Sequence, residues 1–538
     1  MNIRHSLSAA LLFLLVAPTF AVERITVDAA ADRHAIDPRI YGVAFATEAQ
    51  LSELNVPLNR WGGNTASRYN WKLDCDNKGS DWFFQSIAAT KGPLVAGAAA
   101  DAFIARTQAG GAVPMMTVPL LDWMAKVGED RNRKLWSYSR GKYGNQQRYD
   151  QWNPDSGNGL KADGKTPVTG NSPGDANVPN SIEFQRAWLN HLTEKWGAAK
   201  SATDRYYVLD NEPALWNSTH RDVHPAPATL TEVRNKMITY ATMIKAADPK
   251  ALIVGPEEWG WPAYFYSAAD SAWRAKNGYR PNSPDRVAHG NQDFLPYLIA
   301  EFQRASVASG KRLLDVLSIH YYPQGGEYGN NVSPEMQARR NRSTRSLWDP
   351  KYKDETWIND TVRLIPRLKA WAAAYPGTLT GITEYNWGAE GHINGATAQA
   401  DVLGIFGREG LDVAARWTTP ATKSPTFQAL KLYRNYDGKR GAFGETSVRA
   451  VVEQPDRLST FAATRASDRA LTIMVINKLT AATEVTLAVA NFAAAKNAQL
   501  WQVTGDTLTQ LPDMATNNGQ LSFSITGPSI TLVVLAPQ

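Results

Sequence analysis

The sequence predicts an α/β fold, a (β/α)8 barrel, joined to an additional all-β sandwich domain. Between residues 40 and 417 it contains eight short apolar runs without strict alternation, as parallel strands buried on both faces require. Helical stretches lie between many of these runs, and alternation of strand and helix eight times is typical of a barrel. After about Gly441 the runs alternate apolar with polar residues and have no helices between them, which favours an antiparallel sandwich.

The eight predicted barrel strands are short and end in turn-forming or polar residues. They are residues 40–46, 56–61, 113–120, 205–211, 251–257, 314–322, 381–386 and 412–417. Two of the intervening helices carry clear signals. Residues 180–197 place Phe184, Trp188, Leu192 and Trp196 on one helical face, and Thr229 with Glu232 forms a capping-box pattern before a helix that stops ahead of Pro249. We expect the longest irregular stretches, roughly 124–180 and 323–355, to be loops that decorate the barrel.

We assign three segments from these patterns. The barrel spans residues 36–438, and residues 22–35 with 439–538 form the sandwich, because the strand-like run at 24–30 can join it before the chain enters the barrel. Residues 1–21 begin with Arg4 and His5, continue as an apolar run and end in the small residue Ala21, which is the pattern of a secretory signal peptide. The alternative is a membrane anchor, but the apolar run is short for a bilayer. We therefore expect a secreted protein, extracellular or periplasmic, without a membrane segment after cleavage.

Charge and cysteine content exclude several classes of protein. The net charge of +6 is small for 538 residues and the basic residues are scattered without a basic stripe, so nucleic-acid binding has little support. Cys75 is the single cysteine, so an internal disulfide is excluded and a large core must stabilise the chain. A reactive thiol is the alternative to a buried inert one, but no histidine lies near Cys75 in the sequence. Nothing in the sequence suggests more than a monomer.

Aromatic residues are abundant and many lie in polar loops. The chain has 18 Trp and 20 Tyr, often beside Gly and Asn, as in "RWGGNTASRYNW" and "EEWGWPAYFY". Flat apolar faces edged by polar groups suit pyranose rings, although packing under loops is the alternative for any single ring. The candidates for sugar stacking are Trp61, Trp71, Trp123, Trp216, Trp259, Trp261, Trp387 and Trp417.

Two carboxylates follow predicted barrel strands directly. Glu212 comes just after the fourth strand and Glu384 lies at the end of the seventh, where the chemistry of this fold takes place. We expect the two strands to lie on opposite sides of the ring, so that the carboxylates face each other across its mouth. One could then protonate a leaving oxygen while the other attacks or stabilises an anomeric carbon, as glycoside hydrolysis needs. Alternatively, Arg60 or Arg416 pairs with them in structural ion pairs, although Arg60 could equally keep a catalytic carboxylate ionised.

Four motifs in this order resemble one family of glycosidases. "RWGGNTASRYNW", "LDNEPALWNSTHRDVHP", "SIHYYPQ" and "GITEYNWG" closely resemble glycoside hydrolase family 44 over nearly the whole chain after residue 21. The resemblance implies a barrel with a β-sandwich and an endo-acting β-1,4-glucanase or xyloglucanase. It implies that Glu212 is the general acid/base, that Glu384 is the nucleophile of a retaining double displacement, and that Asn211 binds the sugar 2-hydroxyl. His320, Tyr321 and Tyr322, at the end of the sixth strand, are then placed to contact Glu384 or substrate; a core role is the alternative for His320.

The reaction requires no cofactor, and the sequence has no zinc-binding pattern. One loop gathers oxygen ligands that suit calcium, although it lacks the full EF-hand spacing. These ligands are Asp150, Asn153, Asp155, Asn158 and Asp163. The family resemblance implies a structural Ca2+ in the barrel, and a solvated polar loop is the alternative.

The leading hypothesis is a secreted retaining endo-β-1,4-glucanase that cleaves xyloglucan and related soluble β-glucans. An endo-acting xylanase or mannanase on the same scaffold is the alternative among enzymes. A non-catalytic polysaccharide-binding protein would need the aromatic residues but no acid/base pair. A barrel aldolase or isomerase would need a Schiff-base lysine or a phosphate-binding glycine loop, and neither is evident. The sandwich could bind polysaccharide through Trp501, but we expect it to be structural.

Overall fold

The computed structural model describes residues 22–201, 205–517 and 519–538. The predicted signal peptide, residues 1–21, lies outside the described residues. Within the described part, none of the helices combines the length and the apolar composition that a membrane crossing requires.

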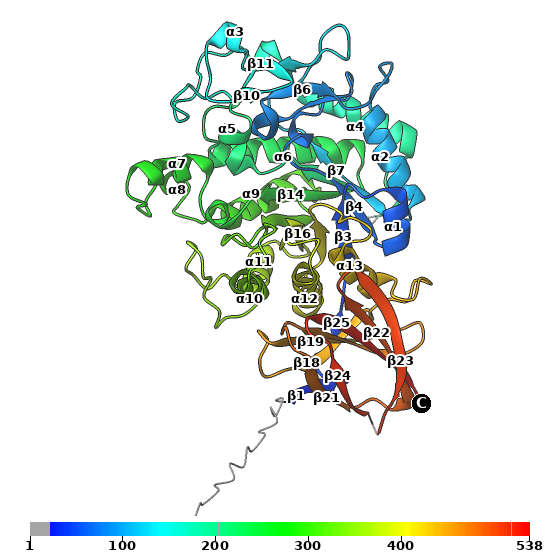
Figure 1. The fold of residues 1–538 in the computed structure, drawn as a ribbon. Coiled ribbons are helices and arrows are strands. Elements are labelled where there is room, and N and C mark those ends of the chain that lie inside the picture. Colours follow the sequence, from blue (N-terminus) through cyan, green and yellow to red (C-terminus); the bar gives the residue numbers. More distant parts are fainter. Residues whose placement is uncertain (1–21, 202–204, 518) are drawn as a thin grey trace, which may run out of the picture.

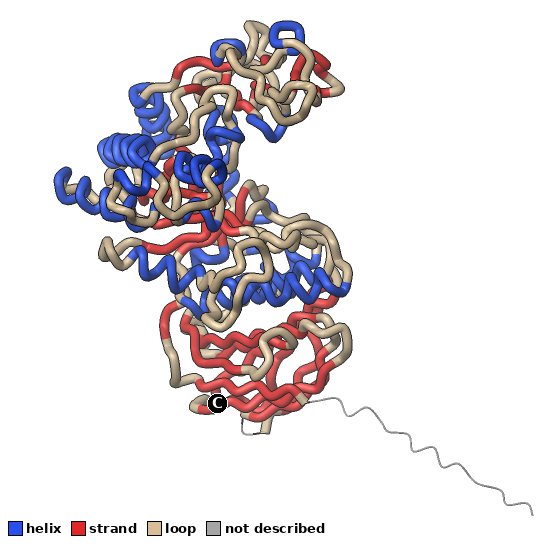
Figure 2. The backbone as a smooth tube through the Cα atoms, turned by 90° about the vertical axis from the view of Figure 1, so that its left-hand side faces the viewer, coloured by secondary structure: helices blue, strands red, loops and turns tan. Residues whose placement is uncertain are grey.

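A closed barrel of eight parallel strands forms the centre of the molecule (Figure 2), and each of the eight predicted strands is present. In chain order the barrel strands are β3 (Gly42–Ala44), β4 (Leu58–Trp61), β7 (Val113–Val118), β13 (Tyr206–Leu209), β14 (Leu252–Glu258), β15 (Val316–Tyr321), β16 (Leu379–Tyr385) and β17 (Val413–Arg416). The predicted fold class is therefore confirmed.

One helix follows each barrel strand and covers the barrel from outside. These helices are α1 (Glu48–Leu54), α2 (Ala98–Ala109), α4 (Ile182–Trp196), α6 (Leu230–Ala247), α9 (Phe294–Ser309), α11 (Leu364–Ala372), α12 (Ile393–Glu409) and α13 (Pro425–Arg434). Thr229 caps α6 by accepting a hydrogen bond from the Glu232 amide, at the start that the sequence predicted. Inside the barrel, a small apolar cluster that includes Leu58, Met115, Val208 and Val316 fills the space, so the barrel is packed and its site must lie at its rim.

Short strands and helices extend the loops beyond the carboxyl ends of the barrel strands. The stretch that the sequence predicts as irregular loop, 124–180, contains small sheets, because backbone pairing satisfies its polar groups. The loop after β4 contributes β5 (Cys75–Asn77) and β6 (Gln85–Ala88), and the loop after β7 contributes β8 (Trp123–Ala125), β9 (Leu135–Trp136), α3 (Arg140–Tyr143), β10 (Tyr149–Asp150), β11 (Asn153–Gly157) and β12 (Asn177–Pro179). In Figure 1 they lie at the end of the molecule opposite the C-terminal sheet.

Further short helices complete the loops after β13, β14 and β15. They are α5 (Trp216–Thr219), α7 (Ala268–Lys276), α8 (Pro284–Ala288) and α10 (Pro334–Ser343). The 3-10 turns η5 (Pro213–Leu215) and η6 (Trp261–Tyr264) follow β13 and β14 directly. The residues of these two turns therefore lie close to the carboxyl ends of β13 and β14, at the rim of the barrel.

The C-terminal part is a ten-stranded sheet that bends at one strand. Its strands are β1 (Glu23–Asp28), β2 (His34–Ala35), β18 (Thr446–Val451), β19 (Leu458–Thr464), β20 (Leu471–Asn477), β21 (Thr483–Ala490), β22 (Ala494–Thr504), β23 (Thr507–Ala515), β24 (Gln520–Ile525) and β25 (Ser529–Pro537). The first half of β18 pairs with β19 and the second half with β1, and apolar residues from both arms form one core. Pairing is antiparallel except between β1 and β21, which are parallel. No hairpin joins these two strands, so turn geometry does not fix their direction.

The two parts of the molecule share a hydrophobic core. Helix α12 packs on β19, β20 and β25, and α13 packs on β22 and β23, so these helices lie between the barrel and the sheet (Figure 1). Trp501, the candidate for polysaccharide binding, instead packs against Tyr436 with ring centroids 5.4 Å apart. The sheet therefore packs against the barrel helices α12 and α13, and Trp501 is part of the contact between the two parts of the molecule.

Gly404 in α12 allows the closest approach in this shared core. A Cβ atom at this position would lie 2.1 Å from Cδ2 of Phe461. We predict that Gly404→Ala destabilises the protein by about 1–3 kcal/mol through overpacking, although alanine favours the helix by about 1 kcal/mol. Thermal unfolding measures the effect, and Gly391→Ala is the control, because its added Cβ would meet no atom within 4 Å. An unchanged Tm for Gly404→Ala would contradict close packing here.

Cys75 is fully buried on β5, and its thiol points to the carbonyl oxygen of Ala125 at 3.5 Å. Burial raises the pKa of this thiol, as do the neighbouring carboxylates of Asp76 and Asp74. The structure thus supports a structural thiol and not a reactive one.

Candidate active site

A strained turn carries Glu212 out of strand β13. Asp210 and Glu212 both have left-handed backbone conformations, with φ of 64° and 45°. Residues other than glycine rarely adopt such conformations. The buried carboxylate of Asp210 holds the turn by accepting hydrogen bonds from the amides of Leu120 (2.6 Å) and Asn211 (2.7 Å). The Glu212 amide donates to the carbonyl oxygen of Glu257 on β14 at 3.1 Å. The turn therefore aims Asn211 and Glu212 at the mouth of the barrel.

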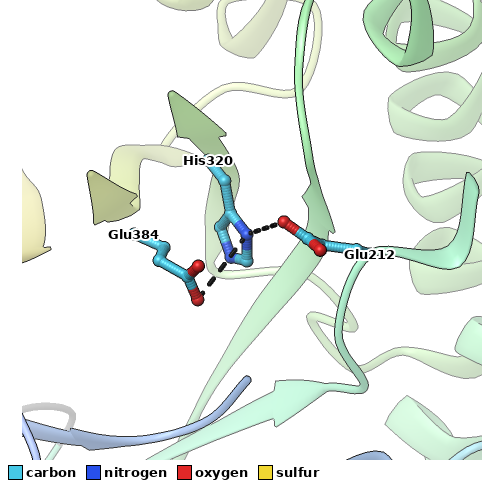
Figure 3. Close-up of side chains that lie close together, drawn as sticks. All are labelled: Glu212, His320 and Glu384. Carbon is cyan, nitrogen blue, oxygen red and sulfur yellow. Dashed lines mark hydrogen bonds and ion pairs between the residues drawn. The ribbon is translucent and has the colours of Figure 1, made fainter. Parts of the chain in front are cut away.

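Glu212 and Glu384 lie close together at this mouth. One carboxylate oxygen of each, together with a ring nitrogen of His320, form a group whose atoms all lie within 4.8 Å of one another. Figure 3 shows the imidazole of His320 between the two carboxylates. The prediction that their strands are on opposite sides of the ring is wrong: only β14 and β15 separate β13 from β16.

Glu384 is held by two hydrogen bonds to its separate oxygens. Arg60, at the end of β4, donates from Nη1 to Oε2 at 2.7 Å, and the hydroxyl of Tyr322 donates to Oε1, also at 2.7 Å. The two contacts hold one oxygen each, so they fix the orientation of the carboxylate. The residue types and positions suit a nucleophile.

His320 is a buried cation that bridges two carboxylates. Its Nδ1 lies 2.8 Å from Oε1 of Glu212, and its Nε2 lies 3.0 Å from Oε2 of Glu257. Burial alone would lower the pKa of His320, but the carboxylates of Glu384, Glu212 and Glu257 raise it to about 10. At neutral pH the ring is therefore an imidazolium that donates from both nitrogens.

Glu257 is the buried counter-ion of this cluster. It has no exposed surface, and its Oε2 accepts from Nη2 of Arg60 at 2.9 Å. Its Oε1 accepts from the hydroxyls of Ser318 and Thr383. Burial would raise the pKa of Glu257, but Arg60, His320 and these hydrogen bonds lower it to about 2. Glu257 stays ionised, so its negative charge compensates the positive charges of Arg60 and His320. These two cations in turn contact Glu384 and Glu212.

The environment of Glu212 favours the protonated acid. Burial raises the pKa of Glu212 and the charge of Glu384 raises it further, while His320 and Arg60 act in the opposite direction; the net shift is upward. Since His320 donates to Oε1, the proton of Glu212 must sit on Oε2. Next to it, burial and the charge of Glu212 raise the pKa of Glu258 to about 8, and Glu258 accepts from the Ala214 amide at 3.3 Å.

Asn211 is held beside the catalytic pair by its neighbours. Its side-chain oxygen accepts from Nη2 of Arg60 at 3.2 Å, and its amide nitrogen donates to Asn64 at 3.1 Å. Its backbone carbonyl accepts from the indole of Trp216 at 3.2 Å. The side chain is therefore fixed next to Glu212, where a sugar hydroxyl would enter.

Three predicted substrate contacts are wrong, because the side chains are buried in the core. Trp216 has no exposed surface and supports Asn211 from behind. Trp387 and Tyr321 are each 2% exposed and pack against each other with ring centroids 5.7 Å apart. These rings pack in the core below the site, and none of them has a face exposed to a sugar.

The other candidate tryptophans differ in their surroundings. Trp61 packs among the rings of Phe45, Tyr69 and Phe103, and Trp71 packs against Phe184 and His191. Trp123 lies on β8 in the two-stranded sheet with β12. Three candidates lie by Arg60 or line a cavity whose wall includes Ala214 and Leu215. They are Trp417, whose ring centroid is 5.6 Å from the guanidinium of Arg60, and Trp259 and Trp261.

The predicted calcium ligands do not form a metal site in the described structure. Asp150 accepts from the side chains of Gln85 and Asn153, Asp155 accepts from the indole of Trp136, and Asp163 accepts from the amides of its own loop. Within the described ranges, the carboxylates that could share an ion are those of Glu212 and Glu384 with His320. Asn153 and Asn158 likewise bond within their loops. With these hydrogen bonds to other groups of the protein, the residues do not fit the ion.

The cluster of Glu212, His320 and Glu384 has the donor types of a metal site but not its electrostatics. Both nitrogens of His320 already contact carboxylates, and the guanidinium of Arg60 bonds directly to Glu384. A cation bound there would face two fixed positive groups at close range. The arrangement fits proton transfer and nucleophilic attack without a metal.

A (β/α)8 barrel with two close carboxyl groups at the carboxyl ends of its strands, one held by an arginine and a tyrosine and the other with a raised pKa, has the site of a glycoside hydrolase. Comparison with known proteins agrees with this class. The profile of glycoside hydrolase family 44 matches residues 75–325. Endoglucanase A of Paenibacillus lautus is 31% identical over an alignment of 477 residues that covers 84% of this chain and 63% of that protein. The chain therefore spans less than two thirds of the length of this relative.

Solved structures match over nearly the whole chain. CelM2, a bifunctional glucanase-xylanase from a metagenome library, is 54% identical with a TM-score of 0.93, covering 96% of this chain and 99% of that one. A Paenibacillus polymyxa xyloglucanase of family 44, solved with xyloglucan, is 26% identical with a TM-score of 0.78, covering 96% and 100%. The chain belongs to glycoside hydrolase family 44.

Proposed function

We propose that this protein is a retaining endo-β-1,4-glucanase that hydrolyses internal bonds of xyloglucan and related soluble β-glucans. The observation that carries the proposal is the separation of the catalytic oxygens, which lie within 4.8 Å of each other. Retaining glycosidases hold their carboxyl groups about 5–5.5 Å apart, whereas inverting enzymes need roughly 6.5–9.5 Å to admit a water molecule. Glu384, held by Arg60 and Tyr322, and Glu212, whose pKa is raised, supply the two roles.

In the first step Glu384 attacks the anomeric carbon while Glu212 protonates the glycosidic oxygen. The bond between the carbon and that oxygen breaks, and the proton passes from Oε2 of Glu212 to the leaving chain. The hydrogen bonds from Arg60 and Tyr322 keep Glu384 oriented before attack. The amide of Asn211 is placed to bond the 2-hydroxyl of the reacting sugar, an interaction that strengthens toward the transition state.

In the second step the glycosyl-enzyme is hydrolysed. Glu212, now ionised, removes a proton from water, whose oxygen attacks the anomeric carbon and releases Glu384. His320 donates to Oε1 throughout, so Glu212 always exchanges its proton through Oε2. Both steps use side chains of this chain alone, and we propose that no metal takes part.

The substrate proposal rests on the named relatives and on one alternative. An endoglucanase and a xyloglucanase with bound xyloglucan support β-1,4-glucans. The bifunctional glucanase-xylanase, which is the more similar in sequence of the two solved structures, supports xylan as a second substrate of the same site. We further propose that the chain is exported, on the signal-like residues 1–21, and acts as a monomer.

The test is a panel of polysaccharides with two readouts. Purified protein is incubated with xyloglucan, carboxymethylcellulose, xylan and glucomannan, and reducing ends are measured together with viscosity. We expect release from the glucans with a fast fall in viscosity, which indicates internal cleavage. Proton NMR of the first product should show the β-anomer, as retention requires. Release mainly from xylan or glucomannan would overturn the substrate, an α-anomer would overturn the mechanism, and no release from any polymer would favour a binding protein.

A further inference from the structure

A cavity of about 580 Å³ lies at the junction of the barrel and the C-terminal sheet. Its wall includes Tyr41, which ends η1 (Pro38–Tyr41) directly before β3, and much of the segment 434–445 between α13 and β18. Because the barrel strands are parallel, Tyr41 lies at their amino ends, whereas Glu212 and Glu384 lie at their carboxyl ends. The cavity is therefore on the opposite face of the barrel from the catalytic cluster.

The charged residues in the wall of this cavity differ in their partners. They are the cations Arg434, Lys439, Arg440 and Arg465 and the acids Asp437, Glu445 and Asp468. Arg465 pairs with Asp468 at 2.7 Å and also donates to the hydroxyl of Tyr436 at 2.9 Å. The other three cations form no ion pair with any residue of the described ranges. The wall therefore carries positive charge that the chain itself does not neutralise.

Arg434 is the cation that lies deepest in this wall. It is half-buried at the end of α13, where its Nε donates to the carbonyl oxygen of Asn55 at 3.1 Å and its guanidinium lies 5.1 Å from the ring centroid of Tyr41. Burial lowers the pKa of Arg434, because no carboxylate lies beside the charge. Its Nη1 and Nη2 groups have no acceptor in the part of the chain that the structure describes, so they are available to an anion.

The hydroxyl of Tyr41 is a second donor in the same wall. The side chain is only 3% exposed, yet the hydroxyl bonds to no group within residues 22–201, 205–517 and 519–538. Burial raises the pKa of Tyr41, so the hydroxyl keeps its proton and can donate it to a hydrogen bond. Buried polar groups are almost always hydrogen-bonded, so this one indicates a partner from outside the chain.

The acids of the wall distinguish between kinds of anion. Oδ1 of Asp437 accepts from the amides of Lys439 and Gly441, both at 2.8 Å, whereas its Oδ2 has no donor among the described residues. A ligand that places an anionic group against Arg434 must therefore also offer hydroxyl groups to Asp437. Sulfate has no such donor. The volume lies within the range of about 300–1,000 Å³ that sites for small organic molecules have.

We propose that this cavity is an accessory binding site for an acidic saccharide, in which Arg434 and Tyr41 hold the carboxylate of a hexuronic acid while Asp437 accepts from its hydroxyl groups. A guanidinium and a carboxylate can pair through two parallel hydrogen bonds. Lys439 and Arg440 are exposed beside the cavity and attract the anion. The inference does not depend on the proposed function, because the site uses none of the catalytic residues. An acidic side chain of a polysaccharide could be held here while the cleft stays free.

The test measures the binding of D-glucuronic acid to the purified protein by isothermal titration calorimetry at neutral pH. D-Glucose, which lacks the carboxylate, and sulfate, which lacks the hydroxyl groups, are the comparison ligands. We expect saturable binding of glucuronic acid, at least about tenfold tighter than that of either comparison ligand. Arg434→Gln should weaken it by at least about tenfold and Tyr41→Phe by about two- to tenfold, since they remove a charged and a neutral hydrogen bond. Tyr41→Phe should fold, because it removes only a hydroxyl that no described protein group uses.

A pair of exposed lysines supplies the control. Lys439→Ala should weaken the binding by about two- to fivefold, whereas Lys165→Ala, on the stretch 124–180 and outside the cavity walls, should leave it unchanged. Hydrolysis of xyloglucan should be the same in Tyr41→Phe and Lys439→Ala as in the unaltered protein, because the cavity and the catalytic cluster lie on opposite faces of the barrel.

Four results would overturn the inference. These are the absence of saturable binding of glucuronic acid, equal binding of glucose, equal binding of sulfate, and binding that neither Arg434→Gln nor Tyr41→Phe weakens, which would place the ligand elsewhere. The absence of polysaccharide hydrolysis by the unaltered protein would instead contradict the proposed function and leave this inference standing.

Discussion

Glu384→Ala should lower the hydrolysis of xyloglucan by at least about 10⁴-fold, because removal of a nucleophile leaves only the contributions of binding and charge. Glu212→Ala should lower it by about 10²–10⁴-fold, since a sugar alkoxide leaves slowly without a proton. With a dinitrophenyl β-cellobioside, whose leaving group needs no proton, the first step of Glu212→Ala should stay fast. The measurement is kcat/KM on both substrates for both variants.

Azide distinguishes catalytic roles from structural ones. In Glu384→Ala it should enter the space of the missing carboxylate and attack the aryl cellobioside from that face, which gives the α-azide. In Glu212→Ala it should attack the glycosyl-enzyme from the other face, which gives the β-azide. Loss of activity in either variant without the corresponding azide product, while the fold is intact, would make that glutamate a structural residue. An exchange of the two products would reverse the assigned roles.

The strands of the barrel could be predicted because each is a short apolar run between polar turns, and burial on both faces leaves little freedom in composition. The small sheets of the 124–180 stretch could not be predicted in this way. Their strands are two to five residues long and carry polar side chains such as those of Tyr149, Asp150 and Asn153, so they depend on backbone pairing that local sequence does not encode. The parallel pairing of β1 with β21 likewise depends on contacts between distant segments.

Within the site, position along a strand was more informative than residue type. Glu212 and Glu384 are predictable from the sequence because one follows an apolar strand directly and the other lies at the end of one. Glu257 and Glu258 end β14 in the same way, and this signal could have identified them before the structure did. By contrast, the aromatic criterion selected Trp216 and Trp387, which are buried. A tryptophan beside polar residues in the sequence can pack on the buried side of a catalytic loop as well as on its exposed side. The sequence alone does not show which of the two sides it occupies.

Glu257→Gln should destabilise the protein by about 3–5 kcal/mol, because it leaves the buried charges of Arg60 and His320 without their shared counter-ion. The effect should depend on pH. The folded-state pKa of Glu257, about 2, lies below its usual value of 4.5, so its stabilisation is present above pH 4.5 and is lost as the pH falls through about 2. The folded-state pKa of His320, about 10, lies above its usual value of 6.5, so its stabilisation is complete below pH 6.5 and is lost as the pH rises through 10.

Both contributions to stability are fully present between pH 4.5 and 6.5. In this range the difference in the free energy of unfolding between the unaltered protein and Glu257→Gln should be largest. Urea unfolding across pH 3–9 measures it. Glu355→Gln is the matched control, since its carboxylate pairs with Arg342 at the surface and an exposed pair contributes about 0–1 kcal/mol. The activity of Glu257→Gln adds a second readout. With one carboxylate fewer, the pKa of His320 falls, the imidazole loses its proton at lower pH, and the alkaline limb of kcat/KM should move toward neutral. A variant as stable as the control, with an unshifted alkaline limb, would show that Glu257 does not set the charge of His320.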